Sequence, residues 1–249
     1  MFIVDVDRVY GGNELFTKEK FLFYERLPST QDRAKELIKS GVVKKGYAIV
    51  ADEQYRGRGR FSRMWSSRKG KSLTFSLVVE KIPLLSMGTA LSVVEALRDE
   101  CGLWAEIEWP NDIVVSGQKI CGILVEMQRQ LAVIGVGVNV NETALPFDNA
   151  TSIRMETGKP ADRESILSAF LSIFEGNLKK ENIMDSVREH LSFMNRYVEI
   201  ETENGKVRGE FINLGDDGEI IIRTESGTAT SFLPGEAKRV HKLDAPACR

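Results

Sequence analysis

Short apolar runs and amphipathic stretches alternate along the first hundred residues. Residues 21–27 form a brief apolar run that predicts a strand. Ser29 and Thr30 carry hydroxyl side chains of the kind that cap helices, and they precede an amphipathic run over residues 31–39. Gly41 follows that run and marks its end. The pattern therefore predicts a strand, a cap and a helix in that order.

The middle of the chain continues with apolar runs of strand length and with three predicted helices. Further strands are predicted at residues 47–51, 73–79, 105–109, 113–115, 118–127 and 131–140. Helices are predicted at residues 84–100, where Gly102 gives a stop, at residues 165–178, and between residues 182 and 195. These elements predict an α+β fold, with a mixed, mostly antiparallel sheet flanked by helices.

From Tyr197 onward the texture changes to short alternating polar and apolar runs. Turn signals at Asn204-Gly205 and at Asp216-Asp217-Gly218 separate these runs. The pattern predicts a small β-barrel of about 45 residues. We therefore expect a catalytic-sized domain at residues 1–195 and a small domain at residues 196–249. Only about 20 residues precede the first predicted strand, so no helix-turn-helix module is expected there.

Composition narrows the class of protein. Of the 249 residues, 42% are hydrophobic and 28% are charged, which is typical of a folded protein, and the net charge of −2 offers no overall attraction to nucleic acid or membrane. Cys101, Cys121 and Cys248 are odd in number and far apart, which predicts reduced thiols and a cytoplasmic location. We find no signal peptide and no apolar run of about 18 residues. His190 and His241 alone do not suggest a metal site.

A dense run of positive charge separates the second and third predicted strands. Residues 54–71 read QYRGRGRFSRMWSSRKGK, and the next acidic residue is Glu80. Such a run repels itself unless an anion binds to it. Arginine forks suit polyphosphates, and Gly57 and Gly59 permit a close approach of the backbone. A solvated basic loop or an RNA-binding segment would have the same composition, so this loop alone leaves three interpretations open.

Two further motifs carry polar residues at predicted strand ends. Asn111 and Asp112 follow Pro110, and Lys119 lies across a predicted hairpin turn from them, although taken alone an ordinary hairpin with a surface lysine fits better. Gly135 and Gly137 alternate along a strand, which keeps one face of a sheet open for a flat group such as a purine. The same glycines would also fit a bulge or close helix packing.

In this order and at this spacing, the motifs resemble the biotin protein ligase family. The resemblance rests on Ser-Thr at 29–30, GRGR-x-x-R-x-W at 57–65, WPND at 109–112, KICGILVE at 119–126 and GVGVNVN at 135–141, and it extends over residues 23–240. It implies a class II synthetase-like catalytic domain with an SH3-like C-terminal barrel, of the monofunctional type without an N-terminal DNA-binding domain. Departures are Gln31 where the family usually has Asn, Phe61-Ser62 after GRGR, and Glu108 where Lys is common.

The resemblance also implies the residues of the site. The implied biotin-binding residues are Ser29, Thr30, Gln54, Gly57, Arg58, Lys119 and Gly122. The implied residues for ATP and the adenylate are Arg58, Arg60, Arg63, Trp65, Asn111, Lys119 and Asn139. Arg60, Lys119 and Asp112 are the implied catalytic residues, and Asp112 is also the implied ligand of Mg²⁺.

By the same resemblance, the expected reaction activates biotin with ATP as biotinyl-5′-AMP and then transfers biotin to a lysine. The expected partners are a biotin carboxyl carrier domain and a second copy of the chain, with no nucleic acid and no membrane. Two rivals stay open. A lipoate ligase or an octanoyl transferase has a related fold, and the transferases use a cysteine, for which Cys121 is the candidate. A nucleic-acid-binding protein would use the basic loop and the small barrel.

Overall fold

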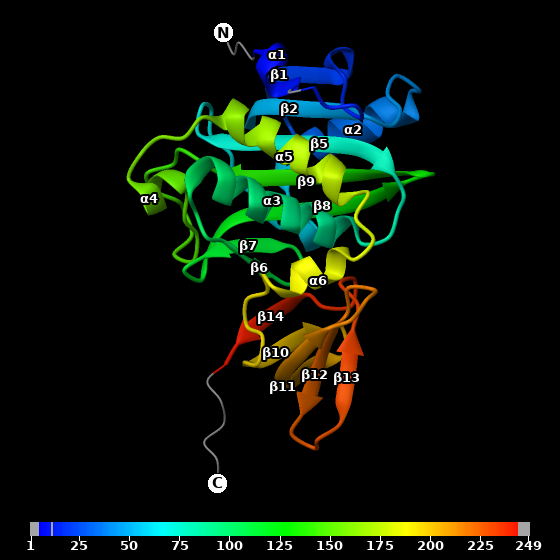
Figure 1. Ribbon diagram of the computed structural model, residues 1–249, viewed down its shortest axis with the longest axis vertical. Helices are drawn as coiled ribbons and strands as arrows, with labels where there is room; N and C mark the ends of the chain where they lie inside the picture. Colours follow the sequence, from blue (N-terminus) through cyan, green and yellow to red (C-terminus); the bar gives the residue numbers. More distant parts are fainter. Residues whose placement is uncertain (1–4, 11, 244–249) are drawn as a thin grey trace.

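The computed structural model describes residues 5–10 and 12–243, which contain two large sheets and a two-stranded ribbon (Figure 1). The larger sheet has seven strands in the order β1-β2-β5-β9-β8-β7-β6. These strands are β1 (Phe21–Leu27), β2 (Tyr47–Gln54), β5 (Ser72–Glu80), β6 (Glu106–Glu108), β7 (Asp112–Val115), β8 (Gln118–Gln128) and β9 (Leu131–Asn139). Strands β1 and β2 are parallel and all other neighbours are antiparallel, which confirms the predicted mixed sheet.

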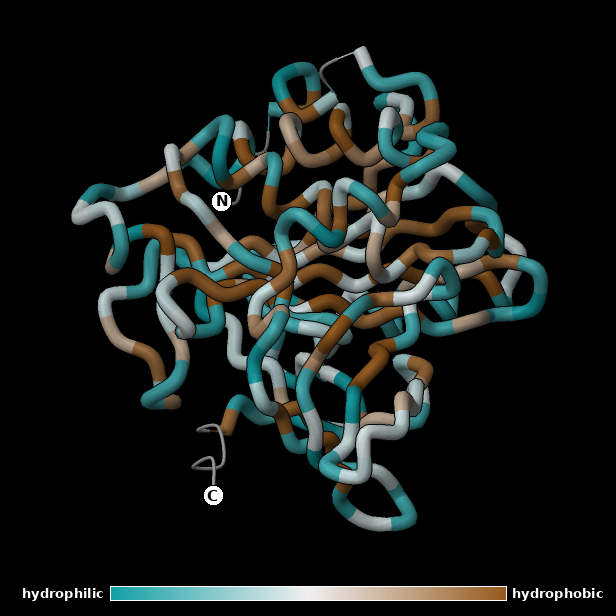
Figure 2. The backbone as a smooth tube through the Cα atoms, turned by 60° about the horizontal axis from the view of Figure 1, so that its bottom comes forward, coloured by the Kyte–Doolittle hydropathy of each residue, from teal (hydrophilic) through white to brown (hydrophobic). Residues whose placement is uncertain are grey.

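Helices cover the two faces of this sheet unequally. On one face lie α3 (Leu85–Cys101) and α5 (Arg163–Asn177), which pack on the large hydrophobic core. On the other face α2 (Thr30–Lys39) buries Ala34 and Leu37 against Ile49, Val78 and Val133. Helix α2 has only ten residues. The part of this sheet face that lies beyond the N-terminus of α2 is therefore not covered by a helix. Figure 2 shows the apolar strands in the middle of the molecule and polar segments on its outer loops.

The ends of α2 and α3 follow the capping signals in the sequence. Ser29 is the N-cap of α2, where its Oγ accepts a hydrogen bond from the Asp32 backbone N–H at 3.3 Å. Helix α3 ends at Gly102, which adopts a left-handed conformation with φ +65°. Both predicted helices are confirmed within one or two residues.

Several short elements differ from the predicted pattern. Helix α6 (Ile183–Arg188) occupies only part of the stretch between residues 182 and 195. The structure adds α1 (Val6–Tyr10), η1 (Lys18–Lys20), η2 (Arg60–Ser62), α4 (Ile153–Thr157) and a two-stranded ribbon of β3 (Gly57–Arg58) and β4 (Met64–Trp65). The basic loop is therefore a small hairpin rather than an irregular segment.

The second sheet is antiparallel and has the strand order β13-β12-β11-β10-β14. Its strands are β10 (Tyr197–Thr202), β11 (Gly205–Leu214), β12 (Ile220–Thr224), β13 (Ala229–Phe232) and β14 (Arg239–Lys242). Val198, Ile200 and Phe211 belong to the same core cluster as the large sheet, so the small sheet packs directly on the first unit. The predicted α+β class with a small C-terminal β unit is confirmed. A boundary between residues 195 and 196 stays a prediction.

In the part of the chain that the structure describes, no helix is long and apolar enough to cross a membrane.

Candidate active site

A cavity of about 680 Å³ opens on the α2 face of the large sheet, where that helix leaves the strands uncovered. This volume suits a small-molecule ligand. The sheet forms its floor, residues 58–60 and 63–66 form one wall, and residues 238–241 of the C-terminal unit border it. Candidate residues at the cavity are Ser29, Thr30, Gln54, Arg58, Arg60, Arg63, Trp65, Asn111, Asp112, Lys119, Gly122 and Asn139.

The floor of the cavity is a row of residues that crosses four strands. Strand register pairs Glu108 with Asp112, Asp112 with Gly122, and Gly122 with Gly137. Residues paired directly across neighbouring strands point to the same face, so the two carboxylates and the two glycines share the α2 face. Because glycine lacks a Cβ, the two glycines leave room above the sheet, and Trp65 fills part of it. A Cβ on Gly137 would lie 2.6 Å from Trp65 Cζ2.

This arrangement differs from the open glycine face expected for a purine. Gly137 lies under the Trp65 indole, and a Cβ on Gly135 would lie 2.8 Å from Gln31 Oε1. Each glycine is needed because a side chain of the protein itself occupies the space. The indole Nε1 of Trp65 is buried without a hydrogen-bond partner among the described residues, which leaves one donor available inside the cavity.

At one end of the cavity, buried polar side chains form a hydrogen-bonded group. The backbone N–H of Thr30 donates to Gln54 Oε1 at 2.7 Å, and Thr30 Oγ1 donates to the same oxygen at 3.1 Å. Ser76 Oγ lies 2.8 Å from Thr30 Oγ1 and 3.1 Å from Gln31 Oε1. Thr30, Gln31 and Gln54 line the cavity, and Ser76 supports them from behind, so this end presents several donors and acceptors to one polar ring.

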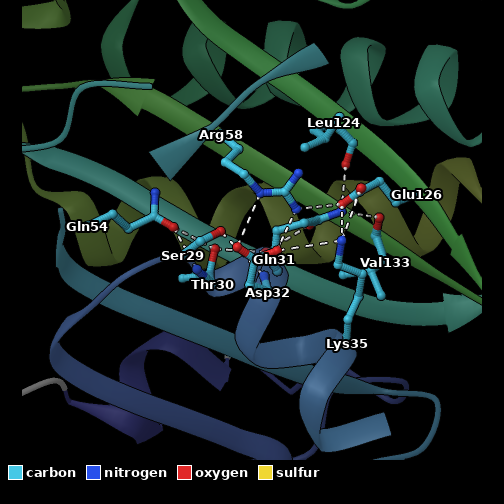
Figure 3. Close-up of polar contacts among 11 residues, drawn as sticks. Ser29, Thr30, Gln31, Asp32, Lys35, Gln54, Arg58, Leu124, Glu126 and Val133 are labelled. Atoms are coloured by element: carbon cyan, nitrogen blue, oxygen red, sulfur yellow. Dashed lines mark hydrogen bonds and ion pairs between the residues drawn. The ribbon is translucent and has the colours of Figure 1, made fainter. Parts of the chain in front are cut away.

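Gln31 anchors this polar end to the sheet. Its Nε2 donates to the Val133 carbonyl at 3.0 Å and contacts the Leu124 carbonyl at 3.4 Å, so one side chain spans β8 and β9 (Figure 3). An Asn at this position would be one methylene shorter. The longer Gln fits because Gly135 lies directly beneath it.

Lys119 puts a positive charge over the middle of the floor. Its Nζ lies 2.7 Å from Asp112 Oδ1 and 5.8 Å from the centre of the Trp65 ring. The same ammonium would lie 3.3 Å from a Cβ on Gly122. Asn111 Nδ2 also donates to Asp112 Oδ1, at 3.1 Å. The WPND segment and Lys119 therefore come together as one polar cluster rather than as an ordinary surface hairpin.

Arg60 and Arg63 join the basic loop to the small sheet. Arg60 Nη2 donates to the carbonyls of Pro234 and Ala237, the latter at 2.7 Å, and Arg60 Nη1 donates to Asn111 Oδ1 at 3.0 Å. Arg63 Nη2 donates to the Lys238 carbonyl at 3.1 Å. Burial lowers the pKa of Arg60, and the Asp112 carboxylate partly offsets this effect. The carbonyls orient both guanidinium groups without neutralising them.

Glu108 is the most strongly perturbed carboxyl group at the cavity. Burial is the main cause, and the nearby Asp112 carboxylate is the second; together they raise the pKa of Glu108 to about 7, although Lys119 lowers it. The side chain lines the cavity beside the WPND motif. Sequence motifs identified Glu108 only as a departure from the family pattern.

The surroundings of two candidate residues indicate a structural role. Gly57 does not line the cavity. A Cβ there would lie 2.6 Å from the Trp65 carbonyl oxygen, so this glycine permits the tight β3–β4 pairing. Asn139 lines the cavity, but its Nδ2 donates to the Thr151 carbonyl at 2.9 Å and thereby holds the following loop.

Motif reasoning missed several residues around the site, among them Asp32, Ser76, Glu126 and Lys238. Asp32 and Glu126 could have been noticed, because Asp32 follows the Ser-Thr motif by two residues and Glu126 ends KICGILVE. Lys238 carries no such signal, since only the packing of the small sheet brings it to the cavity.

Known proteins are similar to this chain in both sequence and fold. Residues 23–140 match the model of the biotin/lipoate A/B protein ligase family. The bifunctional ligase/repressor BirA of Bacillus subtilis is 31% identical over 231 residues, which span 84% of this chain and 71% of that protein. The chain belongs to the biotin protein ligase family. Its activity is that of a biotin protein ligase.

Further relatives support this membership. The biotin–[acetyl-CoA-carboxylase] ligase of Paracoccus denitrificans is 28% identical, over 72% of this chain and 85% of its own length. The structure of a biotin protein ligase from Aquifex aeolicus in complex with biotin and ATP superposes with a TM-score of 0.81 at 31% identity. That alignment covers 90% of this chain and all of the Aquifex chain.

Proposed function

We propose that the cavity binds biotin and ATP together and carries out both halves of the ligation. The observation that carries this proposal is the position of Lys119, whose ammonium lies over the middle of the glycine floor, beside the Trp65 ring. On this proposal the ureido ring of biotin binds at Ser29, Thr30 and Gln54, and ATP binds along the arginine loop. The biotin carboxylate then meets the α-phosphate at Lys119.

In the first half-reaction a carboxylate oxygen of biotin attacks the α-phosphorus of ATP. The bond to the pyrophosphate oxygen breaks, and a mixed anhydride of biotin and AMP forms. Because two anions must approach each other, the barrier is largely electrostatic, and cations fixed in advance lower it. Lys119 and Arg60 supply such cations, and the carbonyl contacts of Arg60 keep its guanidinium oriented before the ligand arrives.

Trp65 and Asn111 belong to the same nucleotide side of the cavity. The indole of Trp65 lies against Gly122 and Gly137, where it offers an aromatic surface for the adenylate. Asn111 contacts both Arg60 and Asp112, so it couples the phosphate side to the Lys119 cluster. Arg63 extends the positive charge toward Lys238.

We propose that Mg²⁺ accompanies ATP, held chiefly by phosphate oxygens with Asp112 as a protein ligand. Magnesium in such sites commonly uses one or two carboxylates together with substrate phosphates. Among residues 5–10 and 12–243, no group of three or more His, Cys, Asp or Glu side chains could hold a metal by itself. The donor set thus fits a metal that arrives with its nucleotide and neutralises the leaving pyrophosphate.

In the second half-reaction the amine of an acceptor lysine attacks the anhydride carbonyl, AMP leaves, and the amine gives up a proton. We propose Asp112 as the proton acceptor. Asp112→Asn should then slow transfer from preformed biotinyl-5′-AMP by about 100-fold in single-turnover experiments. The control is Asp148→Asn, which removes an exposed carboxylate from the loop beside the cavity. If Asp112→Asn transfers biotin at the wild-type rate, Asp112 is not the proton acceptor.

The rival interpretations receive less support. Cys121 is fully buried and burial raises the pKa of its thiol, so it is a poor nucleophile for an octanoyl transferase. Arg58, Arg60 and Arg63 contact groups of the protein around a cavity, which favours a small anionic ligand over an RNA strand. No nucleic acid or membrane partner is proposed.

We propose a biotin carboxyl carrier domain as the acceptor, a homodimer as the assembly and the cytoplasm as the location. Relatives named biotin–[acetyl-CoA-carboxylase] ligase support the acceptor, and the family resemblance supports the dimer. The partly buried Cys101 and the fully buried Cys121 are both free thiols, as expected in a reducing compartment. Analytical ultracentrifugation of the full chain would test the dimer.

The test of the whole proposal is transfer to a carrier domain, followed by intact mass spectrometry. Purified carrier domain is incubated with the protein, ATP, Mg²⁺ and either biotin or lipoate. The proposal predicts the mass of one biotinyl group on one lysine, and no mass change with lipoate or without ATP. Modification with lipoate in preference to biotin would contradict it.

A further inference from the structure

Four charged side chains from three elements form a closed ring above the polar end of the cavity. Asp32 and Lys35 belong to α2, Arg58 belongs to β3 and Glu126 belongs to β8 (Figure 3). Arg58 pairs with Asp32 in a bidentate manner, with Nη2 to Oδ1 at 2.5 Å and Nε to Oδ2 at 3.2 Å. These four residues form what we call the latch.

Each member of the latch contacts two partners of opposite charge. Glu126 Oε2 accepts from Arg58 Nη2 at 3.3 Å and lies 3.0 Å from Lys35 Nζ. Lys35 Nζ closes the ring at 3.5 Å from Asp32 Oδ1. The hydrogen bond to Asp32 raises the pKa of Arg58. Two cations and two anions thus alternate without excess charge.

The latch joins a loop to two fixed elements. Helix α2 is held by its buried residues Ala34 and Ile38, and β8 is paired on both sides in the large sheet. Arg58, in contrast, belongs to a strand of two residues within the arginine loop. Arg60 and Arg63 fasten the far side of this loop to the carbonyls of Ala237 and Lys238, in the connection between β13 and β14. On the side nearest the polar end, the backbone of the loop is held by the β3–β4 pairing and by the N–H groups of Tyr55 and Arg56, which donate to the carbonyls of Leu27 and Pro28 at 3.2 and 3.0 Å. The latch adds the side-chain contacts that fix Arg58 itself.

We propose that Asp32 and Glu126 are positioning residues which, through Arg58, hold the arginine loop closed over the biotin-binding end of the cavity before any ligand binds. This inference rests on the proposed function for the identity of the ligand. A loop that is already ordered costs less entropy when the ligand arrives, so the latch should strengthen biotin binding without changing the chemical step. Neither carboxylate approaches Lys119 within an ion-pair distance.

The main test is Asp32→Asn, which keeps the shape of the side chain and removes its charge. The side chains of Arg58 and Asp32 are 32% and 47% exposed, so the pair is of the partly solvated kind with a modest effect. We expect the KM for biotin in pyrophosphate release to rise about fivefold while kcat stays within about twofold. The wild-type KM should also rise between about 0.05 and 0.5 M KCl, and the variant KM should respond less.

The matched control is Glu36→Gln on the same helix. Glu36 pairs with Arg33 at 2.7 Å on the exposed side of α2, outside the latch. This substitution removes the same charge from the same helix, so the KM for biotin should stay at the wild-type value. An equal rise in both variants would show a general effect of helix charge and would overturn the proposal.

A double-mutant cycle separates the latch from a purely structural role of Asp32. An acidic residue in the first helical turn also stabilises the helix through its dipole, and that turn carries Ser29 and Thr30. If Asp32 acts through Arg58, Asp32→Asn should have no further effect on KM in an Arg58→Gln background. If the fivefold rise persists in that background, the latch is not the cause.

Limited trypsin digestion of the protein without ligands gives a readout that does not depend on activity. The loop offers cleavage sites at Arg56, Arg58, Arg60 and Arg63. Asp32→Asn should be cut in this loop several times faster than wild type, whereas Glu36→Gln should not. If the wild-type protein shows no biotin-dependent pyrophosphate release but Asp32→Asn is still cut faster, the latch is supported and biotin is rejected as the ligand. Equal cleavage together with an unchanged KM would reject the latch.

Discussion

Glu108 shows how one residue can depart from a family pattern and still be accommodated. Its carboxyl group lies opposite Asp112 on the neighbouring strand, in a partly buried position at the cavity. Burial and the Asp112 carboxylate raise its pKa to about 7. In the folded protein the group therefore holds its proton at pH values where it is ionised in the unfolded chain.

This difference predicts a dependence of stability on pH. Between pH values of about 4.5 and 7 the folded state binds more protons than the unfolded state, so Glu108 makes the free energy of unfolding fall as pH rises. Glu108→Gln cannot ionise, so the variant does not lose this stability as pH rises. Because each pKa unit corresponds to about 1.4 kcal/mol, we expect the variant to be about 3 kcal/mol more stable than wild type at pH 8 and nearly equal at pH 4.

Urea unfolding at the two pH values checks this prediction. The control is Glu106→Gln, which removes an exposed carboxylate from the same strand. A stability difference that does not change with pH would show that Glu108 titrates normally.

Gly137 is a second residue whose surroundings make a sharp prediction. A Cβ at this position would overlap the Trp65 indole, with 2.7 Å to Nε1. In Gly137→Ala the indole must therefore leave its place over the floor, which should raise the KM for ATP at least tenfold if Trp65 contacts the adenylate. The control Gly176→Ala has nothing within 4 Å of the added methyl group. A normal KM in steady-state assays of Gly137→Ala would exclude a role of Trp65.

At the scale of residues, the family motifs in the sequence predicted which residues lie at the cavity, but not which side chains they contact. Twelve of the candidate residues that the family resemblance implied line the cavity. The pairing of Arg58 with Asp32 and Glu126 depends on three elements that are distant in sequence, so no local pattern could reveal it. The same holds for the contact between Trp65 and Gly137.

At the scale of elements, the arginine loop is a hairpin fastened on both sides. Its near side is held by Arg58 and its far side by Arg60, which donates to Pro234 and Ala237. A loop held in this way can shield a reactive anhydride from water and from stray amines. The enclosure depends on side chains of the loop, because the β3 and β4 strands have two residues each.

Arg60→Gly should therefore open the loop on its far side. We expect faster release of biotinyl-5′-AMP and the biotinylation of lysines on bystander proteins, which a streptavidin blot of added serum albumin would detect. Ser62→Ala, at an exposed position in the same loop, is the control and should give no bystander labelling. Labelling confined to the carrier domain in Arg60→Gly would contradict a shielding role for this loop.

Long periodic elements were predicted well and short ones were not. Helix α3 and strands β5, β8 and β9 agree closely with their apolar patterns, since each provides many positions on which a period can be recognised. Helices α1 and α4 have five residues each, about one turn and a half, which is too short for a period. The helix predicted between residues 182 and 195 ends at Arg188. Beyond it, Phe193 and Asn195 adopt positive φ angles, which are incompatible with a right-handed helix.

At the scale of the whole molecule, the small sheet is part of the site. Trp109 of the WPND motif donates its Nε1 hydrogen bond to the Gly218 carbonyl at 2.8 Å, and residues 238–241 line the cavity. Alternating polarity predicted that this unit would be a small β structure. Its docking beside the arginine loop was not predictable, because it depends on contacts between residues more than 100 positions apart.

The central claim is that Lys119 joins a biotin carboxylate and an ATP phosphate over the glycine floor. Pyrophosphate release with ATP and Mg²⁺ tests it most directly, with biotin, lipoate and octanoate compared in wild type and in Lys119→Ala. We predict release with biotin alone, and a loss of about 100- to 1000-fold in kcat in the variant, because one fixed cation is removed from the reacting anions. Release with another acid in preference to biotin, or an unchanged rate in Lys119→Ala, would contradict the claim.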